Sequence, residues 1–138
     1  MTVQTADDLI LQIKGPFAGA LPTPDDNLVM RAAKAIAATE KGHSRGAAIT
    51  LEKNLPIASG IGGGSADAAA ALKALRDLWS VPINDAALAR LGLSLGADVP
   101  VCLSSRTSRM QGIGENIETL VPVPPVGVVI VNPGVAVS

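Results

Sequence analysis

Two early segments of the chain have hydrophobic patterns that favour β-strands. Residues 9–14 read LILQIK and are rich in residues that favour strands, and residues 45–55 read RGAAITLEKNL. In the second segment Ala47, Ile49 and Leu51 fall on one side, and Ala48, Thr50 and Glu52 fall on the other. We predict a β-strand in each segment, the first from its composition and the second from its period of two.

Two further segments repeat apolar residues at helical spacing and carry capping signals. Asp25 or Asp26 can cap a helix that runs to about Lys41. Asn84 can cap a shorter helix that runs to about Leu93. We therefore predict one helix between the two strands and another in the second half of the chain.

The most regular helical pattern begins at Ser65 and continues to Ser80. Its apolar stripe consists of Ala68, Leu72, Leu75 and Trp79. This spacing predicts an amphipathic helix that buries the stripe, so Trp79 is interpreted as a core residue.

The remaining segments carry Gly and Pro signals. Residues 96–105, GADVPVCLSS, are predicted to form a turn, and residues 108–120 and 126–138 are predicted to form strands around turns. Strands and helices mix without the regular alternation of a doubly wound sheet, which favours an α+β fold in a single domain.

Composition narrows the class of protein. The 138 residues are 48% hydrophobic and 1% aromatic, so the core must be built from Ala, Leu, Val and Ile. A net charge of −1 without a basic run argues against a nucleic-acid partner. A lone cysteine, Cys102, predicts a reducing cytoplasm, and no apolar run is long enough to predict a membrane span. The oligomeric state stays open.

The segment NLPIASGIGGGSADAAAAL, residues 54–72, joins a glycine-rich loop to a helix. Gly60, Gly62, Gly63 and Gly64 can adopt positive φ and expose bare N–H groups, and a helix start at Ser65 adds its own unpaired N–H groups and a positive dipole end. Together these features predict a phosphate site, with Ser65 as a candidate ligand for Mg²⁺.

Two familiar phosphate motifs do not fit this loop. A P-loop requires a Lys after the last glycine, and the dinucleotide fingerprint requires a Gly where Ser65 stands. A flexible loop with a glycine cap is the alternative interpretation.

Several segments resemble the GHMP kinases, a family of small-molecule kinases. Residues 55–72 are similar to the second motif of that family, and four further segments resemble one member in the right order: 25–36, 95–103, 111–120 and 129–138. The resemblance implies a domain like the second domain of ribosomal protein S5, followed by a ferredoxin-like domain. It also implies transfer of the ATP γ-phosphoryl group, with Mg²⁺, to the 2-hydroxyl of a cytidyl diphosphate methylerythritol in non-mevalonate isoprenoid biosynthesis.

The resemblance assigns roles to particular residues. The expected ATP phosphate-binding residues are Pro56, Ala58, Ser59, Gly60, Gly62, Gly63, Gly64 and Ser65. Asp98 matches the catalytic acid that orients and deprotonates the acceptor hydroxyl, whereas turn chemistry alone makes it a helix cap or an Asx-turn.

The family's catalytic acid works beside a lysine from a first strand, and no matching segment occurs here. Lys14 stands in a different context. We therefore expect residues 1–138 to be a GHMP N-terminal domain that is incomplete at its N-terminus and lacks the C-terminal domain, and to be inactive or nearly so. The alternatives are a homoserine-type or mevalonate-type kinase, or a non-catalytic nucleotide-binding module.

The other polar residues and the glycines of the last third receive structural interpretations. Lys53 and Asn54 are expected at an exposed strand end, with a contact to nucleotide phosphates as the alternative. Asp67 is expected to be a favourable acid at a helix start, with a role in binding Mg²⁺ as the alternative. We interpret Cys102 as a buried core thiol and His43 as a surface residue. The glycines of GIGE, residues 112–115, are expected in a turn.

Overall fold

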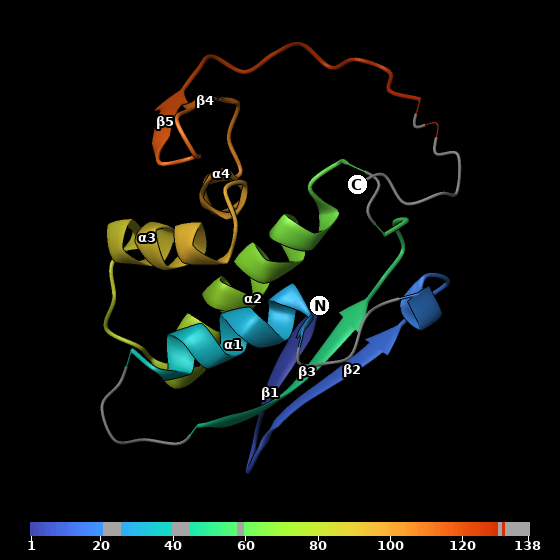
Figure 1. The fold of residues 1–138 in the computed structure, drawn as a ribbon, viewed down its shortest axis with the longest axis vertical. Helices are drawn as coiled ribbons and strands as arrows, with labels where there is room; N and C mark the ends of the chain where they lie inside the picture. The colour runs from blue at the N-terminus through green and yellow to red at the C-terminus, as the bar shows by residue number, and fades with distance from the viewer. Residues whose placement is uncertain (21–25, 40–44, 58–59, 130, 132–138) are drawn as a thin grey trace.

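The computed structural model describes residues 1–20, 26–39, 45–57, 60–129 and 131. Within them the chain forms two small sheets and four α-helices (Figure 1). The elements are β1 (Thr2–Ala6), β2 (Leu9–Lys14), the 3₁₀ turn η1 (Ala18–Ala20), α1 (Leu28–Ala37), β3 (Gly46–Glu52), α2 (Gly63–Trp79), α3 (Asp85–Leu95), α4 (Val99–Ser104), β4 (Ser108–Gln111) and β5 (Asn116–Thr119). This mixed order confirms the α+β class.

The larger sheet has the strand order β1-β3-β2, with β3 in the centre. β1 is antiparallel to β3 and β2 is parallel to it, so Ile49 pairs with both Val3 and Leu11. β1 and β2 are consecutive in the sequence but are not neighbours in the sheet, because β3 lies between them. Both predicted strands are present, and β1 is an additional strand that the sequence pattern did not predict.

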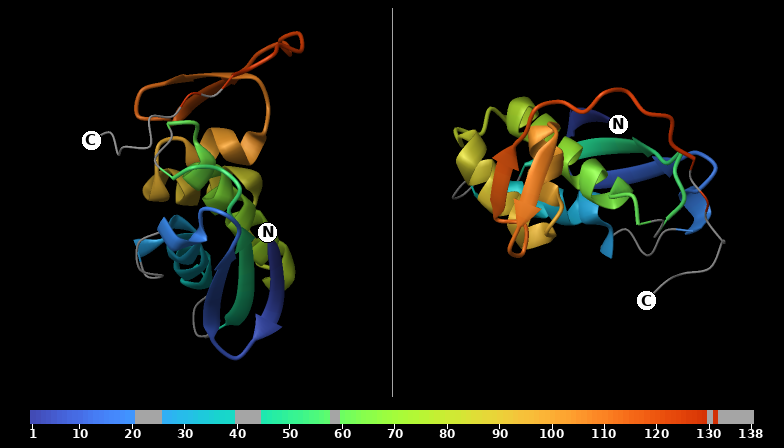
Figure 2. Two further views of the ribbon diagram at one scale, coloured as in Figure 1. Left: turned by 90° about the vertical axis from the view of Figure 1, so that its right-hand side faces the viewer. Right: turned by 90° about the horizontal axis from the view of Figure 1, so that it is seen from above.

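α1 and α2 cover one face of this sheet, as two perpendicular views show (Figures 1 and 2). Ala47, Ile49 and Leu51, which the alternation places on one side of β3, are buried beneath the helices. On the opposite face of the sheet Ile10 remains 55% exposed. The sheet is therefore packed on one side only.

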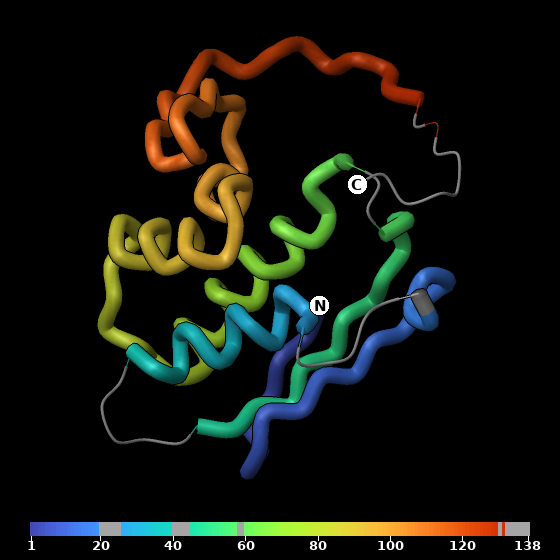
Figure 3. Tube along the Cα trace, viewed as in Figure 1, coloured from blue at the N-terminus to red at the C-terminus, as the bar shows by residue number. Residues whose placement is uncertain are grey.

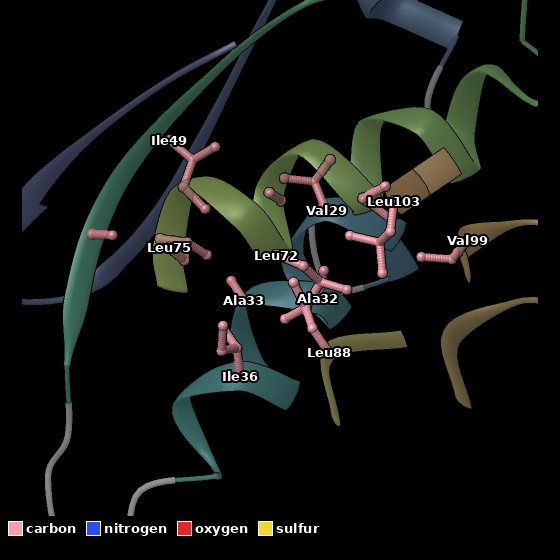
Figure 4. Packing of buried hydrophobic residues seen from close by; sticks show 14 of the residues in the cluster. Val29, Ala32, Ala33, Ile36, Ile49, Leu72, Leu75, Leu88, Val99 and Leu103 are labelled. Atoms are coloured by element: carbon pink, nitrogen blue, oxygen red, sulfur yellow. The ribbon is translucent and has the colours of Figure 1, made fainter. Parts of the chain in front are cut away.

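The core lies where β3, α1 and α2 meet (Figure 4). Ile49 points from the sheet toward Leu75 of α2, and Leu72 and Ile36 are fully buried. The predicted stripe of Ala68, Leu72, Leu75 and Trp79 is buried throughout. The indole of Trp79 donates a hydrogen bond to the Gly46 carbonyl (3.3 Å), which satisfies its polar atom within the core.

α4 packs against α2 and α3, and the β4–β5 hairpin lies at the end of the molecule away from the sheet (Figure 2). Gly92 of α3 allows the close approach of α4, because a Cβ there would lie 3.0 Å from the Cγ1 of Val99. After β5 the chain continues as an extended segment over the top of the molecule (Figure 3). In the described part of the chain, no helix combines the length and apolar character that a bilayer crossing requires.

Several predicted boundaries were wrong. The cap of α1 is Asn27, whose side chain accepts a hydrogen bond from the Val29 N–H (2.9 Å), and the helix ends at Ala37, well before the predicted Lys41. Asp26 is exposed, and Asp25 and Lys41 lie outside the described residues. α2 begins at Gly63, two residues before the predicted start, because Gly62 in the left-handed region already places its carbonyl in the first helical hydrogen bond.

Two predictions for the second half were also wrong. The segment predicted as a turn contains the helix α4, because Pro100 stands in the first helical turn, where its missing N–H costs nothing. Of the segment 126–138, which was predicted to form a strand, residues 126–129 and 131 are described and are not a strand, and the other residues lie outside the described part of the chain. Val126, Val128 and Val129 are exposed there, so the β-favouring sequence has no sheet to pair with.

Candidate functional site

A cavity of about 330 Å³ lies between the starts of α1 and α2, beside the end of β3. The glycine segment, which comprises Gly60, Gly62, Gly63 and Gly64, lines one side of it together with Ser65. Pro56 also lines this cavity, whereas Ala58 and Ser59 lie outside the described residues. The fold thus brings most of the predicted phosphate-binding residues to one concave surface.

The start of α2 presents backbone donors to this cavity. Gly60 and Gly62 adopt φ values of 72° and 73°, whereas Gly63 and Gly64 are already helical, which corrects the expectation that all four lie in a loop. Gly62 is the N-cap and its position carries no side-chain cap hydrogen bond. The first N–H groups of α2 therefore remain available to an anion, at the positive end of the helix dipole.

A buried cation stands beside these donors. Lys53 is 6% exposed, and its Nζ lies 2.6 Å from Oδ2 of Asp67 in the first turns of α2. The Nζ is also 3.6 Å from the point where a Cβ on Gly63 would stand. The expectation that Lys53 is an exposed strand end was wrong, whereas Asn54 is exposed and bonds only to Glu52 among the interactions described.

The backbone of Lys53 is held by the end of β2. Its N–H donates to the Lys14 carbonyl (2.7 Å), and its carbonyl accepts from the Phe17 N–H (3.3 Å). Gly15, at φ = 100°, permits this contact, because a Cβ there would lie 2.6 Å from the Lys53 carbonyl oxygen. The backbone of Lys53 is therefore fixed by hydrogen bonds, and its ammonium group is fixed by the ion pair with Asp67.

Part of the cavity lining is apolar. It is formed by Leu28 at the start of α1, Leu51 of β3, and Pro56 and Ile57 of the following loop. The Cδ1 of Leu28 lies 3.4 Å from the position of a Cβ on Gly64, so this glycine lets the two helix starts approach. One cavity thus offers an apolar surface next to anion-binding backbone groups.

Asp98 lies outside this cavity lining. It is exposed and precedes α4, with no side-chain cap hydrogen bond. Burial first, and the charge of Asp98 second, raise the pKa of the Cys102 thiol above its ordinary value. Cys102 packs against the core but is only half-buried, so the expectation of a buried core thiol is met in part.

The turn of the β4–β5 hairpin supports the segment that carries Asp98. Gly114 has φ = 99° and is buried, and a Cβ at this position would stand 2.2 Å from the carbonyl oxygen of Ala97. The predicted turn at residues 112–115 is therefore present, and its tip packs against the residue that precedes Asp98.

Oxygen ligands for a hard cation are available in the first cavity. Ser65 lines it together with Asp67, although the Asp67 carboxylate is engaged by Lys53. Within the residues that the structure covers, no three His, Cys, Asp or Glu side chains form a cluster suited to a metal ion. The Ser65 hydroxyl at the start of α2 fits Mg²⁺ that arrives with a phosphorylated ligand, because Mg²⁺ takes few protein ligands and keeps water or phosphate oxygens.

Sequence reasoning ranked the exposed position of Lys53 above a contact with phosphates, and it did not anticipate that the start of α1 lines the cavity. The signal for Lys53 was present in the alternation of β3, since Ala47, Ile49 and Leu51 are followed on the same face by residue 53. The approach of Asn27 and Leu28 to the glycine segment depends on helix packing and had no signal in the local sequence.

Comparison with known proteins shows that the sequence is similar to a family of kinases. Residues 27–106 match the family described as GHMP kinases N terminal domain. The chain is 56% identical over 135 residues to the 4-diphosphocytidyl-2-C-methyl-D-erythritol kinase of Cereibacter sphaeroides, a match that covers 97% of this chain and 45% of that protein. It is 54% identical to the enzyme of the same name from Parvibaculum lavamentivorans, covering 100% of this chain and 47% of the relative.

Solved structures show the same relationship. A crystal structure of 4-(cytidine 5'-diphospho)-2C-methyl-D-erythritol kinase superposes with a TM-score of 0.68 at 35% identity, covering 86% of this chain and 40% of that one. A homoserine kinase from Cytophaga hutchinsonii superposes with a TM-score of 0.57 at 22% identity, covering 72% of this chain and 32% of that one, and shows the shared fold alone. The chain spans a little less than half the length of these curated relatives. The family match over more than half of its residues shows that the chain belongs to the GHMP kinases.

Proposed function

We propose that this chain is the nucleotide-binding domain of a kinase that phosphorylates the 2-hydroxyl of 4-diphosphocytidyl-2-C-methyl-D-erythritol in isoprenoid precursor biosynthesis. The observation that carries the proposal is the cavity at the start of α2, which is lined by the first residues of that helix, by Lys53 and by apolar side chains. The identity to two kinases of that name supports the choice of substrate.

The cavity suits ATP in one orientation. The base would lie against Leu28, Leu51 and Ile57, because apolar surface favours a planar ring over a charged phosphate. The phosphates would extend toward Gly62, Gly63 and the hydroxyl of Ser65, where N–H groups and the helix dipole favour negative charge. Lys53 would then add a positive charge close to the phosphate chain.

Phosphoryl transfer requires positioning and charge stabilisation more than covalent chemistry. Mg²⁺ bound with ATP would neutralise phosphate charge, and the Ser65 hydroxyl would help to hold it. We assign Asp98 the role of orienting and deprotonating the acceptor hydroxyl. Its exposure leaves the carboxylate open to an acceptor, although it does not line the ATP cavity in this chain.

We further propose that residues 1–138 make up most of an N-terminal GHMP domain and that a C-terminal domain completes the enzyme. The chain alone is then expected to transfer phosphate poorly or not at all. A cytoplasmic location, expected from the lone cysteine, belongs to the same proposal.

The decisive experiment measures transfer of the ATP γ-phosphoryl group with Mg²⁺ by a protein extended to the length of the relatives. The acceptors are the cytidyl substrate, homoserine and mevalonate. Transfer to the cytidyl substrate alone is expected, and preference for another acceptor would overturn the substrate assignment.

A matched pair of substitutions separates catalysis from binding. Asp98→Asn is expected to lower the transfer rate by about 10²-fold or more while ATP affinity stays unchanged. Asp85→Asn, which alters an exposed carboxylate outside the ATP cavity, serves as the control. ATP binding without transfer to any acceptor would instead identify a non-catalytic nucleotide-binding module.

A further inference from the structure

A second cavity, of about 750 Å³, lies between α2, α3, α4 and the β4–β5 hairpin. Its lining includes Lys73 and Arg76 from α2, Asp85 and Leu88 from α3, Leu103 from α4, and Arg106. None of its lining residues lines the cavity at the glycine segment. Along α2 the nearest lining residues of the two cavities are Asp67 and Lys73, which are separated by about 9 Å of helix.

Cations outnumber carboxylates in this second cavity. The guanidinium group of Arg76 is neutralised locally, because it lies 2.7 Å from Asp85 and 3.2 Å from Asp77. Lys73 and Arg106 have no carboxylate partner among the described residues. The chain as a whole carries a net charge of −1, so this local excess of positive charge does not follow from a basic composition.

The cavity also has an apolar surface, which is formed in part by side chains of the hydrophobic core. Leu88 is 2% exposed and Leu103 is 9% exposed, and Pro100 and Ile117 complete the surface. Near the rim, the hydroxyl of Ser104 donates to the Val101 carbonyl (2.8 Å), which leaves its oxygen as an acceptor only. The cationic side chains and the Thr119 hydroxyl are therefore the polar groups of the lining that can donate hydrogen bonds to a ligand.

We propose that this cavity binds a small organic anion. Lys73 and Arg106 hold its phosphate or carboxylate group, and Leu88 and Leu103 contact its apolar body. A concave apolar floor with a few charged groups at its rim is the usual construction of a small-molecule site, and this volume falls in the usual range. The proposal stands on residues outside the nucleotide cavity, so it does not depend on the kinase assignment.

The test is a titration of the ¹⁵N-labelled chain with phenyl phosphate, followed by NMR. Saturable shifts are expected at the amides of Ala89, Ile117 and Thr119, which belong to lining residues of the second cavity. Benzyl alcohol, which has an apolar body without the charge, is expected to bind at least about tenfold more weakly, since it cannot engage the cations. Shifts confined to the glycine segment, or no saturable shifts, would overturn the proposal.

Variants identify the groups that bind. The double substitution Lys73→Met and Arg106→Met is expected to weaken phenyl phosphate binding by about tenfold or more, whereas Lys73→Arg with Arg106→Lys is expected to retain most of it. Arg90→Met removes an exposed cation of α3 that does not line the cavity and is expected to change nothing. Because each spectrum also reports folding, the single variants replace the double variant if that protein unfolds. Equal affinity in the Lys73→Met, Arg106→Met and Arg90→Met proteins would overturn the proposal.

Discussion

The Nζ of Lys53 lies 2.6 Å from Oδ2 of Asp67, and this ion pair joins the end of the central strand to the first turns of α2. The glycine segment connects the two elements that the pair holds together. Lys53 is 6% exposed and the Asp67 side chain 27% exposed, so water screens this pair only in part. The pair therefore contributes both to stability and to the shape of the proposed nucleotide cavity.

Removing the carboxylate tests the stabilising part of this role. Asp67→Asn leaves the Lys53 ammonium buried without its counter-charge, and we expect a loss of about 1–3 kcal/mol in the free energy of unfolding, between the values for surface and buried pairs. Urea denaturation measures it. Asp77→Asn, which breaks the exposed pair with Arg76, is the control and should cost less than about 0.5 kcal/mol. Equal losses would contradict the importance of the buried position.

The left-handed conformation of Gly62 provides a second prediction. Gly62→Ala meets no atom within 4 Å but forces an L-residue to φ = 73°, so we expect a loss of about 1–2 kcal/mol. Gly62→Asn should cost less, because Asn tolerates this region. Gly127→Ala, in an exposed segment with open space around it, is the control in thermal unfolding. If Gly62→Ala leaves the unfolding temperature unchanged, the backbone at the N-cap of α2 can adopt another conformation without loss of stability.

Two glycines of the β4–β5 turn should respond differently to the same substitution. In Gly114→Ala the new Cβ would stand 2.2 Å from the Ala97 carbonyl oxygen, which is backbone and cannot move without displacing the segment before Asp98. In Gly112→Ala the new Cβ would meet the Glu115 carboxylate, which can rotate away. We expect Gly114→Ala to cost about 2–3 kcal/mol and Gly112→Ala about 1 kcal/mol. Denaturant unfolding of both variants measures the two losses in the free energy of unfolding. A larger loss for Gly112→Ala than for Gly114→Ala would contradict the prediction.

The reactivity of Cys102 should depend on Asp98. Burial and the negative charge of Asp98 raise the pKa of the thiol, so less thiolate is present at a given pH than in a free cysteine. Asp98→Asn removes one of the two causes, and we expect alkylation by iodoacetamide at pH 8 to become about twofold faster. Asp85→Asn should leave the rate unchanged. A rate unaffected by Asp98→Asn would mean that burial alone controls the thiol.

The raised pKa of Cys102 also makes the stability of the folded chain depend on pH. Since the folded state holds the Cys102 proton more tightly than the unfolded state, the thiol favours folding less as the pH rises past the ordinary cysteine pKa of about 8.5. Cys102→Ser is expected to reduce this alkaline decline, as measured by urea unfolding at pH 7 and pH 10. An unchanged decline would assign it to other groups.

The local sequence determined those features that depend on neighbours along the chain. The alternation around Ile49 specified a strand, and the spacing of Leu72, Leu75 and Trp79 specified the buried side of α2. Asn84 caps α3 as predicted, with its side chain accepting from the Ala87 N–H (2.9 Å). Periodicity and capping are short-range effects, so they can be read without knowledge of the fold.

Tertiary structure decided the features that depend on distant partners. The burial of Lys53 requires Asp67 on another element, and the nucleotide cavity requires the start of α1 to pack beside the glycine segment. The valine-rich segment 126–131 shows the converse, because a strand-like sequence forms no strand where the described residues offer it no pairing partner. A strand needs hydrogen bonds and packing from elsewhere in the chain, whereas a helix closes most of its hydrogen bonds within itself.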